Sequence, residues 1–134
     1  METGLFKKIG FCTDFSENAD QSFVVATEFA VQYGASIEII HVTVHFDEVI
    51  QSHMHYIHEK YVKKLPAGLP CNVNIVSGYP STEILKIVKN KSIDLLVMGT
   101  HGLTGIAHVL FGSTADRLVR SAPCSVLTVR FRQP

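Results

Sequence analysis

The sequence predicts an α/β fold, with an open five-stranded parallel sheet that helices cover on both faces. Short segments rich in Val, Ile and Leu recur along the chain, and segments with helical periodicity separate them. Strands that are apolar on both sides are typical of parallel sheets, because helices bury both faces. The expected strands cover residues 9–12, 36–44, 71–76, 93–98 and 125–131.

Four main helices are expected between these strands. The first begins near Asp14, because Asp14 and Glu17 have the spacing of a capping box, and it ends at Gly34. The second covers residues 47–64 and ends before Pro66. The apolar positions of the first are Ala19, Phe23, Ala26, Ala30 and Tyr33, and those of the second are Ile50, Met54, Ile57 and Tyr61.

The third expected helix opens at Pro80 and Ser81, because proline is favoured at the first helical position. The fourth begins at Ser113 and is closed by Pro123. Their apolar faces consist of Ile84, Leu85 and Val88 in the third helix, and of Ala115, Leu118 and Val119 in the fourth.

Composition narrows the classes of protein. At 134 residues the chain predicts one domain over residues 1–134. The formal net charge is zero and the sequence has no cluster of basic residues, so neither nucleic acid nor a membrane surface is an expected partner. The three separated cysteines favour buried thiols over a disulfide framework. Because no segment has the length of a signal peptide core or a membrane span, we expect a cytoplasmic protein.

A glycine-containing loop follows the fourth expected strand and carries the main functional signal. Gly99 and Gly102 are separated by two residues, and nine more lead to Gly112, Ser113 and Thr114. Glycine permits positive φ or a close approach of the backbone to a ligand. At the start of a helix, the amides of Ser113 and Thr114 would favour an anion. The spacing therefore predicts a phosphate-binding loop.

The loop contains no Lys or Arg between Gly99 and Ser113. Backbone amides, hydroxyls, the helix end and a divalent cation would have to meet the phosphate charge, so modest affinity is expected. His101 and His108 lie in the loop, and their protonation near pH 6.5 would strengthen phosphate binding as the pH falls.

Over nearly its whole length the chain resembles the single-domain universal stress proteins of the ATP-binding, UspA-like subgroup. Residues 13–17 match the first strand-to-helix turn of that family, and residues 40–42 match its second strand. The glycine spacing matches its nucleotide-binding loop, and residues 121–127 match its last helix and strand. Where many nucleotide-binding members have proline before the Thr-Asp pair, this chain has Cys12.

The resemblance implies a sheet of order 3-2-1-4-5 that binds ATP or AMP, with Mg²⁺, across strands one and four. The resemblance implies that adenine and ribose are bordered by Asp14 and Val42, with Thr13 beside them. It also implies that the floor of the nucleotide site is lined by Met98 and Gly99. The phosphates would lie against His101, Gly102, Gly112, Ser113 and Thr114. Family members commonly dimerise through the last strand, so the resemblance also implies a homodimer through residues 125–131.

Three functional hypotheses remain open. The first is a nucleotide-binding stress or signalling module that acts on an unknown protein partner. The second is an interaction protein with the same fold and no nucleotide, and the third is a weak ATPase. No nucleophile with a convincing base is evident, since Ser113 at a helix start usually caps. Helical spacing lets only His55, His58 and Glu59 share a face, so no metal site is predicted.

Overall fold

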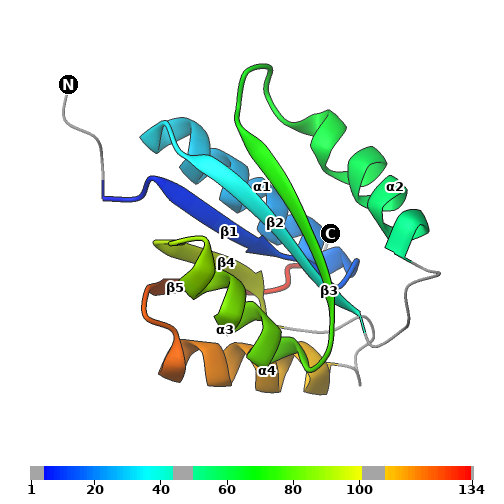
Figure 1. The fold of residues 1–134 in the computed structure, drawn as a ribbon, viewed down its shortest axis with the longest axis vertical. Coiled ribbons are helices and arrows are strands. Elements are labelled where there is room, and N and C mark those ends of the chain that lie inside the picture. The colour runs from blue at the N-terminus through cyan, green and yellow to red at the C-terminus, as the bar shows by residue number, and fades with distance from the viewer. Residues whose placement is uncertain (1–4, 44–49, 101–107, 134) are drawn as a thin grey trace.

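The fold was analysed in a computed structural model of the chain (Figure 1), which describes residues 5–43, 50–100 and 108–133. Five strands form one sheet of order β3-β2-β1-β4-β5, in which every neighbouring pair is parallel. The strands are β1 (Lys8–Cys12), β2 (Ser36–Thr43), β3 (Cys71–Ser77), β4 (Leu95–Gly99) and β5 (Ser125–Val129). The predicted α/β class and the strand order are confirmed.

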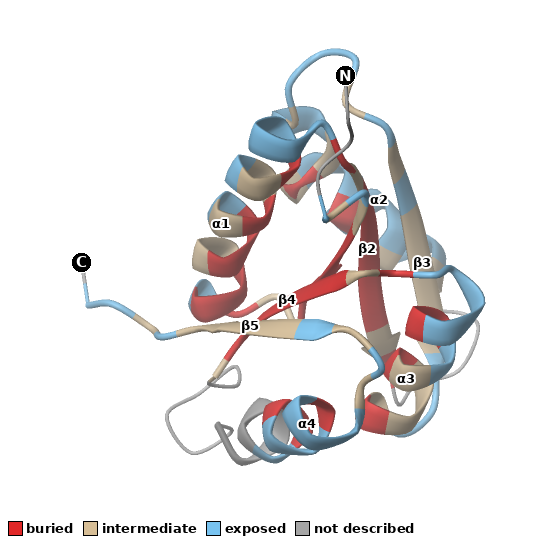
Figure 2. Ribbon diagram, turned by 90° about the vertical axis from the view of Figure 1, so that its left-hand side faces the viewer, coloured by how far each residue is buried: buried red, intermediate tan, exposed pale blue. Residues whose placement is uncertain are grey.

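The helices lie in two layers, one on each side of the sheet (Figures 1 and 2). One layer consists of α1 (Glu17–Tyr33) and α2 (Ile50–Lys60), with a short 3₁₀ helix η2 (Val62–Lys64) after α2. The other layer consists of α3 (Pro80–Asn90) and α4 (His108–Ser121). No helix in the described ranges is long and apolar enough to cross a membrane.

Each face of the sheet has its own core cluster. Under α1 and α2 the cluster contains aromatic rings, with Phe11 and Tyr61 edge to face at a centroid distance of 5.0 Å. Under α3 and α4 it is aliphatic, and Leu96 and Met98 are completely buried there. Strands β1, β2 and β4 are buried along most of their length, as expected for the central strands, and Figure 2 shows this for β2 and β4.

Helix α1 starts three residues later than predicted. Ser16 is its N-cap and accepts a hydrogen bond from the amide of Ala19, while Asp14 stays in the preceding turn. The reason is the backbone at Phe15, whose φ of 68° cannot continue a helix. The helix ends at Gly34 as predicted, with φ at 65°.

Several helical boundaries and faces also differ from prediction. Helix α2 ends at Lys60, and η2 replaces its last expected turn. Tyr33 and Met54 are 39% and 40% exposed, so neither belongs to the buried face of its helix. On α4, Ala115 and Leu118 are buried as predicted but Val119 faces solvent, since the buried stripe of this helix is narrow. Strand β5 ends at Val129, two residues earlier than expected.

The predicted start of α4 is wrong. The helix already includes His108, so Ser113 is its sixth described residue rather than its first. No proline interrupts residues 108–113, and one interior glycine costs a helix only about 1 kcal/mol relative to alanine. The amides of Ser113 and Thr114 therefore lie beyond the first four positions, where helix amides lack an intrahelical acceptor.

Candidate functional site

The strand order reverses between β1 and β4, because the chain leaves β1 toward β2 on one side and later returns to β4 on the other. In open parallel sheets, ligands bind beyond the carboxyl ends of the strands at such a point. We call this place the reversal edge. It consists of the residues at or just beyond the ends of β1, β2 and β4, which are Cys12, Thr13, Asp14, His41, Val42, Met98 and Gly99.

Asp14 is the least satisfied polar residue at the reversal edge. Its Oδ1 accepts a hydrogen bond from the amide of Ser16 at 3.1 Å, whereas its Oδ2 is buried and has no hydrogen-bond partner. Burial raises the pKa of this carboxyl above its usual value, although the hydrogen bonds from Ser16 oppose the shift. An unsatisfied, buried carboxylate oxygen is an acceptor for a ligand that brings a donor.

The hydroxyl of Thr13 is already engaged. Its Oγ1 accepts from the amide of Phe15 at 3.0 Å and lies 2.7 Å from the hydroxyl of Tyr61. Tyr61 donates its own proton to Asp20 Oδ1 at 2.9 Å, so Thr13 must be the donor to Tyr61. The Thr13 side chain thus ties β1 to the α1 and α2 layer and is directed away from the aliphatic face.

His41, near the end of β2, is a further residue of the reversal edge. It is 7% exposed, and its Nδ1 lies 2.9 Å from the carbonyl oxygen of Thr13, which can only accept. Nδ1 therefore carries the proton, and Nε2 is a bare acceptor that is buried without a partner. Burial lowers the pKa of His41, and Phe15 stacks on the ring at a centroid distance of 4.2 Å.

Motif spacing does not point to His41. The available signal is an imidazole within a mostly apolar strand segment, which requires a local hydrogen bond when buried. The ring of His53, on α2, meets His41 at 5.0 Å, and its Nδ1 is also buried without a partner. Histidines on different elements come together here, which helical spacing within α2 could not reveal.

The aliphatic side of the reversal edge is formed by Val42, Met98 and Cys12. All three belong to, or pack against, the core cluster under α3 and α4. Met98 and Cys12 are completely buried, whereas Val42 is partly exposed. Burial raises the pKa of the Cys12 thiol, with the Asp14 charge adding to the effect, so Cys12 acts as an apolar wall.

Position 99 requires glycine for a packing reason that the sequence does not reveal. A Cβ atom at this position would lie 2.6 Å from Cγ of Asn18, which is buried in the first turn of α1. Asn18 donates from Nδ2 to the carbonyl oxygen of Val129 at 3.0 Å, and so links α1 to β5 across the end of β4. The glycine accommodates Asn18, and its φ is not in the left-handed region.

The predicted phosphate-binding residues are only partly described. Ser113 is exposed on α4, whereas the side chain of Thr114 is buried. Gly112 lies within the helix rather than before it. His101 and Gly102 lie outside the described residues, so the structure does not test the expectation that they join the site.

The described residues of the reversal edge are suited to holding a ligand that brings hydrogen-bond donors. Within residues 5–43, 50–100 and 108–133, no group of three His, Cys, Asp or Glu side chains could hold a metal ion. Ser113 lies within α4 rather than at its start, and the hydroxyl of Thr13 is engaged by Tyr61. What the reversal edge offers is a set of unmatched acceptors at Asp14 and His41 beside an apolar wall.

Comparison with known proteins gives a consistent result. The profile of the Universal stress protein family matches residues 5–130 of this chain. The sequence is similar to Universal stress protein MJ0531 of Methanocaldococcus jannaschii, with 32% identity over 94% of this chain and 83% of that protein. The solved structure of the hypothetical protein MJ0577 has a TM-score of 0.79 at 24% identity, covering 98% of this chain and 100% of that chain.

Two similar solved structures contain nucleotides. A universal stress protein in complex with cAMP has a TM-score of 0.73 at 20% identity, covering 94% of this chain and 98% of that chain. The universal stress protein from Archaeoglobus fulgidus in complex with dAMP has a TM-score of 0.70 at 18% identity, covering 94% and 99%. At these identities the likeness shows a shared fold.

Proposed function

Because this chain belongs to the universal stress protein family, we propose that it binds an adenine nucleotide at the reversal edge, between β1 and β4. The observation that carries the proposal is the buried Asp14 Oδ2, which has no hydrogen-bond partner. Similar folds hold cAMP and dAMP, and both ligands carry an adenine amino group that can donate a hydrogen bond. Such a donor would satisfy this oxygen.

The base would lie beside an apolar wall. Val42 is partly exposed next to buried Met98 and Cys12, and apolar side chains with a few placed polar groups are typical of sites for planar ligands. Asp14 would fix the orientation of the base or ribose, while the apolar wall would exclude water from its face. Asp14 would thus supply specificity, and the wall would supply apolar contact.

The phosphates would extend toward the start of α4. Ser113, the sixth described residue of α4, is exposed, and a serine hydroxyl can donate a hydrogen bond. For the amides of Ser113 and Thr114 to reach a phosphate, the residues of α4 before Ser113 would have to leave the helix, because helix amides at these positions face carbonyls one turn back. Gly112 lowers the cost of that change.

We propose ATP or AMP as the ligand, and the affinity for ATP should depend on Mg²⁺. Residues 99–113 contain no Lys or Arg, so the triphosphate charge has no fixed ammonium or guanidinium in this segment. Mg²⁺ should therefore raise the affinity for ATP much more than the affinity for AMP. The bound nucleotide would then alter the surface around α4 that an unknown protein partner contacts, as in a stress-response module.

Calorimetric titration of AMP into the purified chain tests the proposal. We expect one site per chain, and the Asp14→Ala variant should lose about tenfold or more in affinity, about 1.4 kcal/mol, because the donor on the ligand loses a charged acceptor. The matched control is Asp116→Ala. Asp116 is an exposed carboxylate on α4 whose ion pair with Arg120 is also exposed.

Equal AMP affinity in the wild type and the Asp14→Ala variant would contradict the proposed site. A loss in both alanine variants would point to a general charge effect instead. GMP serves as the specificity control, since its base has a carbonyl where adenine has an amino group. GMP should bind more weakly than AMP to the wild type, and the difference should shrink in Asp14→Ala.

The homodimer is a separate part of the proposal, with β5 as the contact strand. Strand β5 is at the edge of the sheet, and an edge strand has backbone groups available for pairing. The chain after β5 is held on α1, where Gln21 donates to the carbonyl of Arg132 at 2.8 Å and accepts from its amide at 2.9 Å. Sedimentation at rising protein concentration should give a dimer, and a persistent monomer would reject it.

All three cysteines are free, and only Cys12 is completely buried. Free, partly exposed thiols at Cys71 and Cys124 suit a reducing compartment, so a cytoplasmic location remains part of the proposal. Location of the tagged full chain by cell fractionation would test it.

A further inference from the structure

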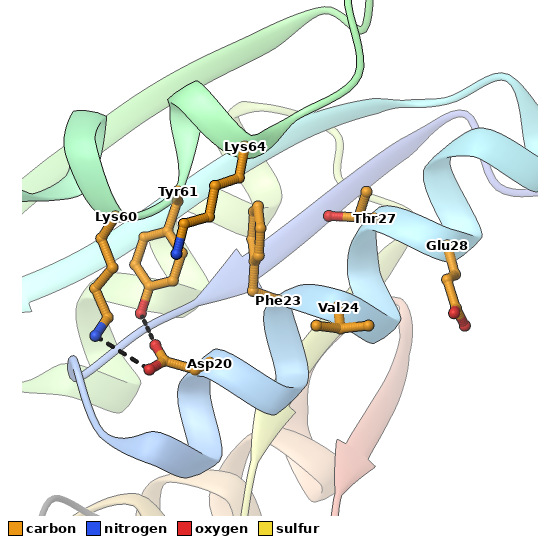
Figure 3. A pocket seen from close by; sticks show the side chains of 8 residues that line it. All are labelled: Asp20, Phe23, Val24, Thr27, Glu28, Lys60, Tyr61 and Lys64. Carbon is orange, nitrogen blue, oxygen red and sulfur yellow. Dashed lines mark hydrogen bonds and ion pairs between the residues drawn. The ribbon is translucent and has the colours of Figure 1, made fainter.

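A pocket of about 430 Å³ opens on the face of the sheet opposite α3 and α4, between α1 and the end of α2 (Figure 3). This volume lies within the range of sites that hold small molecules. The lining residues come from α1, the end of α2 and η2, and they are Asp20, Phe23, Val24, Thr27, Glu28, Lys60, Tyr61 and Lys64. We call it the α1–α2 pocket.

The pocket has an apolar floor and wall. The ring of Phe23 and the ring of Tyr61 are almost fully buried in the core below, and they pack on each other at a centroid distance of 4.9 Å. Val24 is 55% exposed on the side of α1 that borders the opening. A ligand body resting on these residues would remove apolar surface from water, which is favourable.

One hydroxyl in this lining has no partner. Thr27 Oγ1 is buried and makes no hydrogen bond, although a threonine within a helix can bond to a carbonyl one turn back. A buried hydroxyl without a partner costs about 1–3 kcal/mol. Because it lines a pocket rather than a closed core, a ligand atom could supply the missing hydrogen bond.

Some charged side chains around the pocket form ion pairs and others do not. Lys60 and Tyr61 both contact Asp20, at 3.1 Å and 2.9 Å, so the Asp20 carboxylate is matched from two sides. Figure 3 shows the Glu28 carboxylate directed away from Lys64. Within the described part of the chain Lys64 forms no ion pair, and its ammonium lies at the end of the pocket formed by Phe23 and Tyr61. Glu28 also forms no ion pair within the described residues, but it lies at the other end of the lining, so the unpaired charge at the Phe23 and Tyr61 end of the pocket is positive.

From this combination we infer that the α1–α2 pocket binds a small amphipathic anion, such as an aromatic carboxylate or sulfonate. Its apolar body would lie on Phe23 and Val24, its anionic group would reach the Lys64 ammonium, and a polar atom would pair with Thr27 Oγ1. This site lies on the opposite face of the sheet from Val42 and Met98, and so is separate from the nucleotide site proposed above.

The fluorescent anion anilinonaphthalene sulfonate is a suitable probe for the folded, full-length chain. We expect saturable binding at one site. Val24→Asp should weaken it about tenfold or more, because a carboxylate would enter the apolar wall and repel the anion. Val31→Asp is the matched control, since Val31 is 59% exposed on the same helix seven residues later and does not line the pocket.

The cation and the hydroxyl need their own variants. Lys64→Gln should weaken probe binding about twofold to fivefold, the size expected for an exposed charge. Lys63→Gln is its control, because the neighbouring Lys63 is exposed, pairs with Glu59 at 3.0 Å and does not line the pocket. Thr27→Val should weaken the probe slightly while leaving the folded chain as stable as the wild type or more stable.

Two further measurements separate this site from the alternatives. The uncharged N-phenylnaphthylamine should bind more weakly than the sulfonate, and saturating AMP should leave the sulfonate bound. Unchanged affinity in Val24→Asp and Lys64→Gln would overturn the inference, and so would displacement by AMP or non-saturable binding. Failure of AMP to bind at all would contradict only the nucleotide proposal.

Discussion

Glu38 and Asp14 are two carboxylates on neighbouring strands that the fold treats in opposite ways. Glu38, in β2, is 1% exposed, and each of its oxygens accepts from an asparagine amide of β3, from Asn72 and Asn74 at 2.9 Å. Asp14, after β1, keeps one oxygen buried with no partner. Glu38 lies well before the carboxyl end of its strand, whereas Asp14 lies at the reversal edge.

The difference separates a structural carboxylate from a binding one. Where no ligand can reach, the edge strand supplies two amide donors, because a buried charge without partners would be costly. Where a ligand is proposed to bind, the chain leaves an acceptor open. The comparison predicts that removing Glu38 weakens the fold, and that removing the Asp14 charge does not.

The largest expected effect on stability is at Glu38. Glu38→Leu should lower the free energy of unfolding by about 2–3 kcal/mol, because the amides of Asn72 and Asn74 lose a charged acceptor. Urea unfolding with an unchanged slope would measure it. Adding Asn74→Leu should restore part of the loss, since removing both partners leaves fewer unmatched groups. A neutral single variant would contradict the structural role of Glu38.

Gly99→Ala is the next change, and it tests whether packing alone explains a glycine of the reversal edge. The added methyl group would collide with the Asn18 side chain, so the loss should be about 1–2 kcal/mol. In the double variant with Asn18→Ala the two effects should not add, because the methyl group then has room. Additive losses by thermal unfolding would show that Asn18 is not what excludes a side chain at Gly99.

Asp14→Asn should have a smaller effect of opposite sign. Burial raises the folded pKa of Asp14 above 3.8, its ordinary value, so the folded chain holds a proton that the unfolded chain has already lost. The wild type therefore loses stability as the pH rises from 3.8 through the folded pKa. Above that window Asp14→Asn should be more stable by less than about 1 kcal/mol. A variant that is less stable than the wild type at neutral pH would break the comparison with Glu38.

The smallest expected effect is a pH slope from His41. Its pKa is lowered below 6.5, so the unfolded chain takes up a proton before the folded chain does. Stability should then fall as the pH drops from 6.5 toward the folded pKa. His41→Asn keeps a donor for the Thr13 carbonyl and should flatten this part of the curve. An equal slope in both proteins would contradict a contribution from His41.

The sequence predicts the architecture well because the spacing of apolar residues and the backbone preferences of single residues determine local structure. Alternating apolar segments indicate the strands, and Gly34 and Pro80 mark helix boundaries through their own backbone preferences. The candidate site is less predictable. The start of α4 depends on a balance of about 1 kcal/mol around Gly112, which spacing alone does not settle.

Contacts between distant segments could not be predicted either. The approach of Asn18 to Gly99 joins α1 to β4, and the pairing of His41 with His53 joins β2 to α2. Both depend on helix placement on the sheet to within a fraction of a side chain. The sequence could indicate Asp14 from a motif, but not that one of its oxygens is buried without a partner.

The most direct test is the titration of the Asp14 carboxyl itself, followed by carbon NMR of the full chain with and without saturating AMP. If the nucleotide donates a hydrogen bond to Oδ2, it stabilises the charged form, so AMP should lower the pKa of Asp14 and the affinity for AMP should fall as the pH drops through the pKa of the free protein. A pKa of Asp14 that stays the same while AMP is bound would contradict the account.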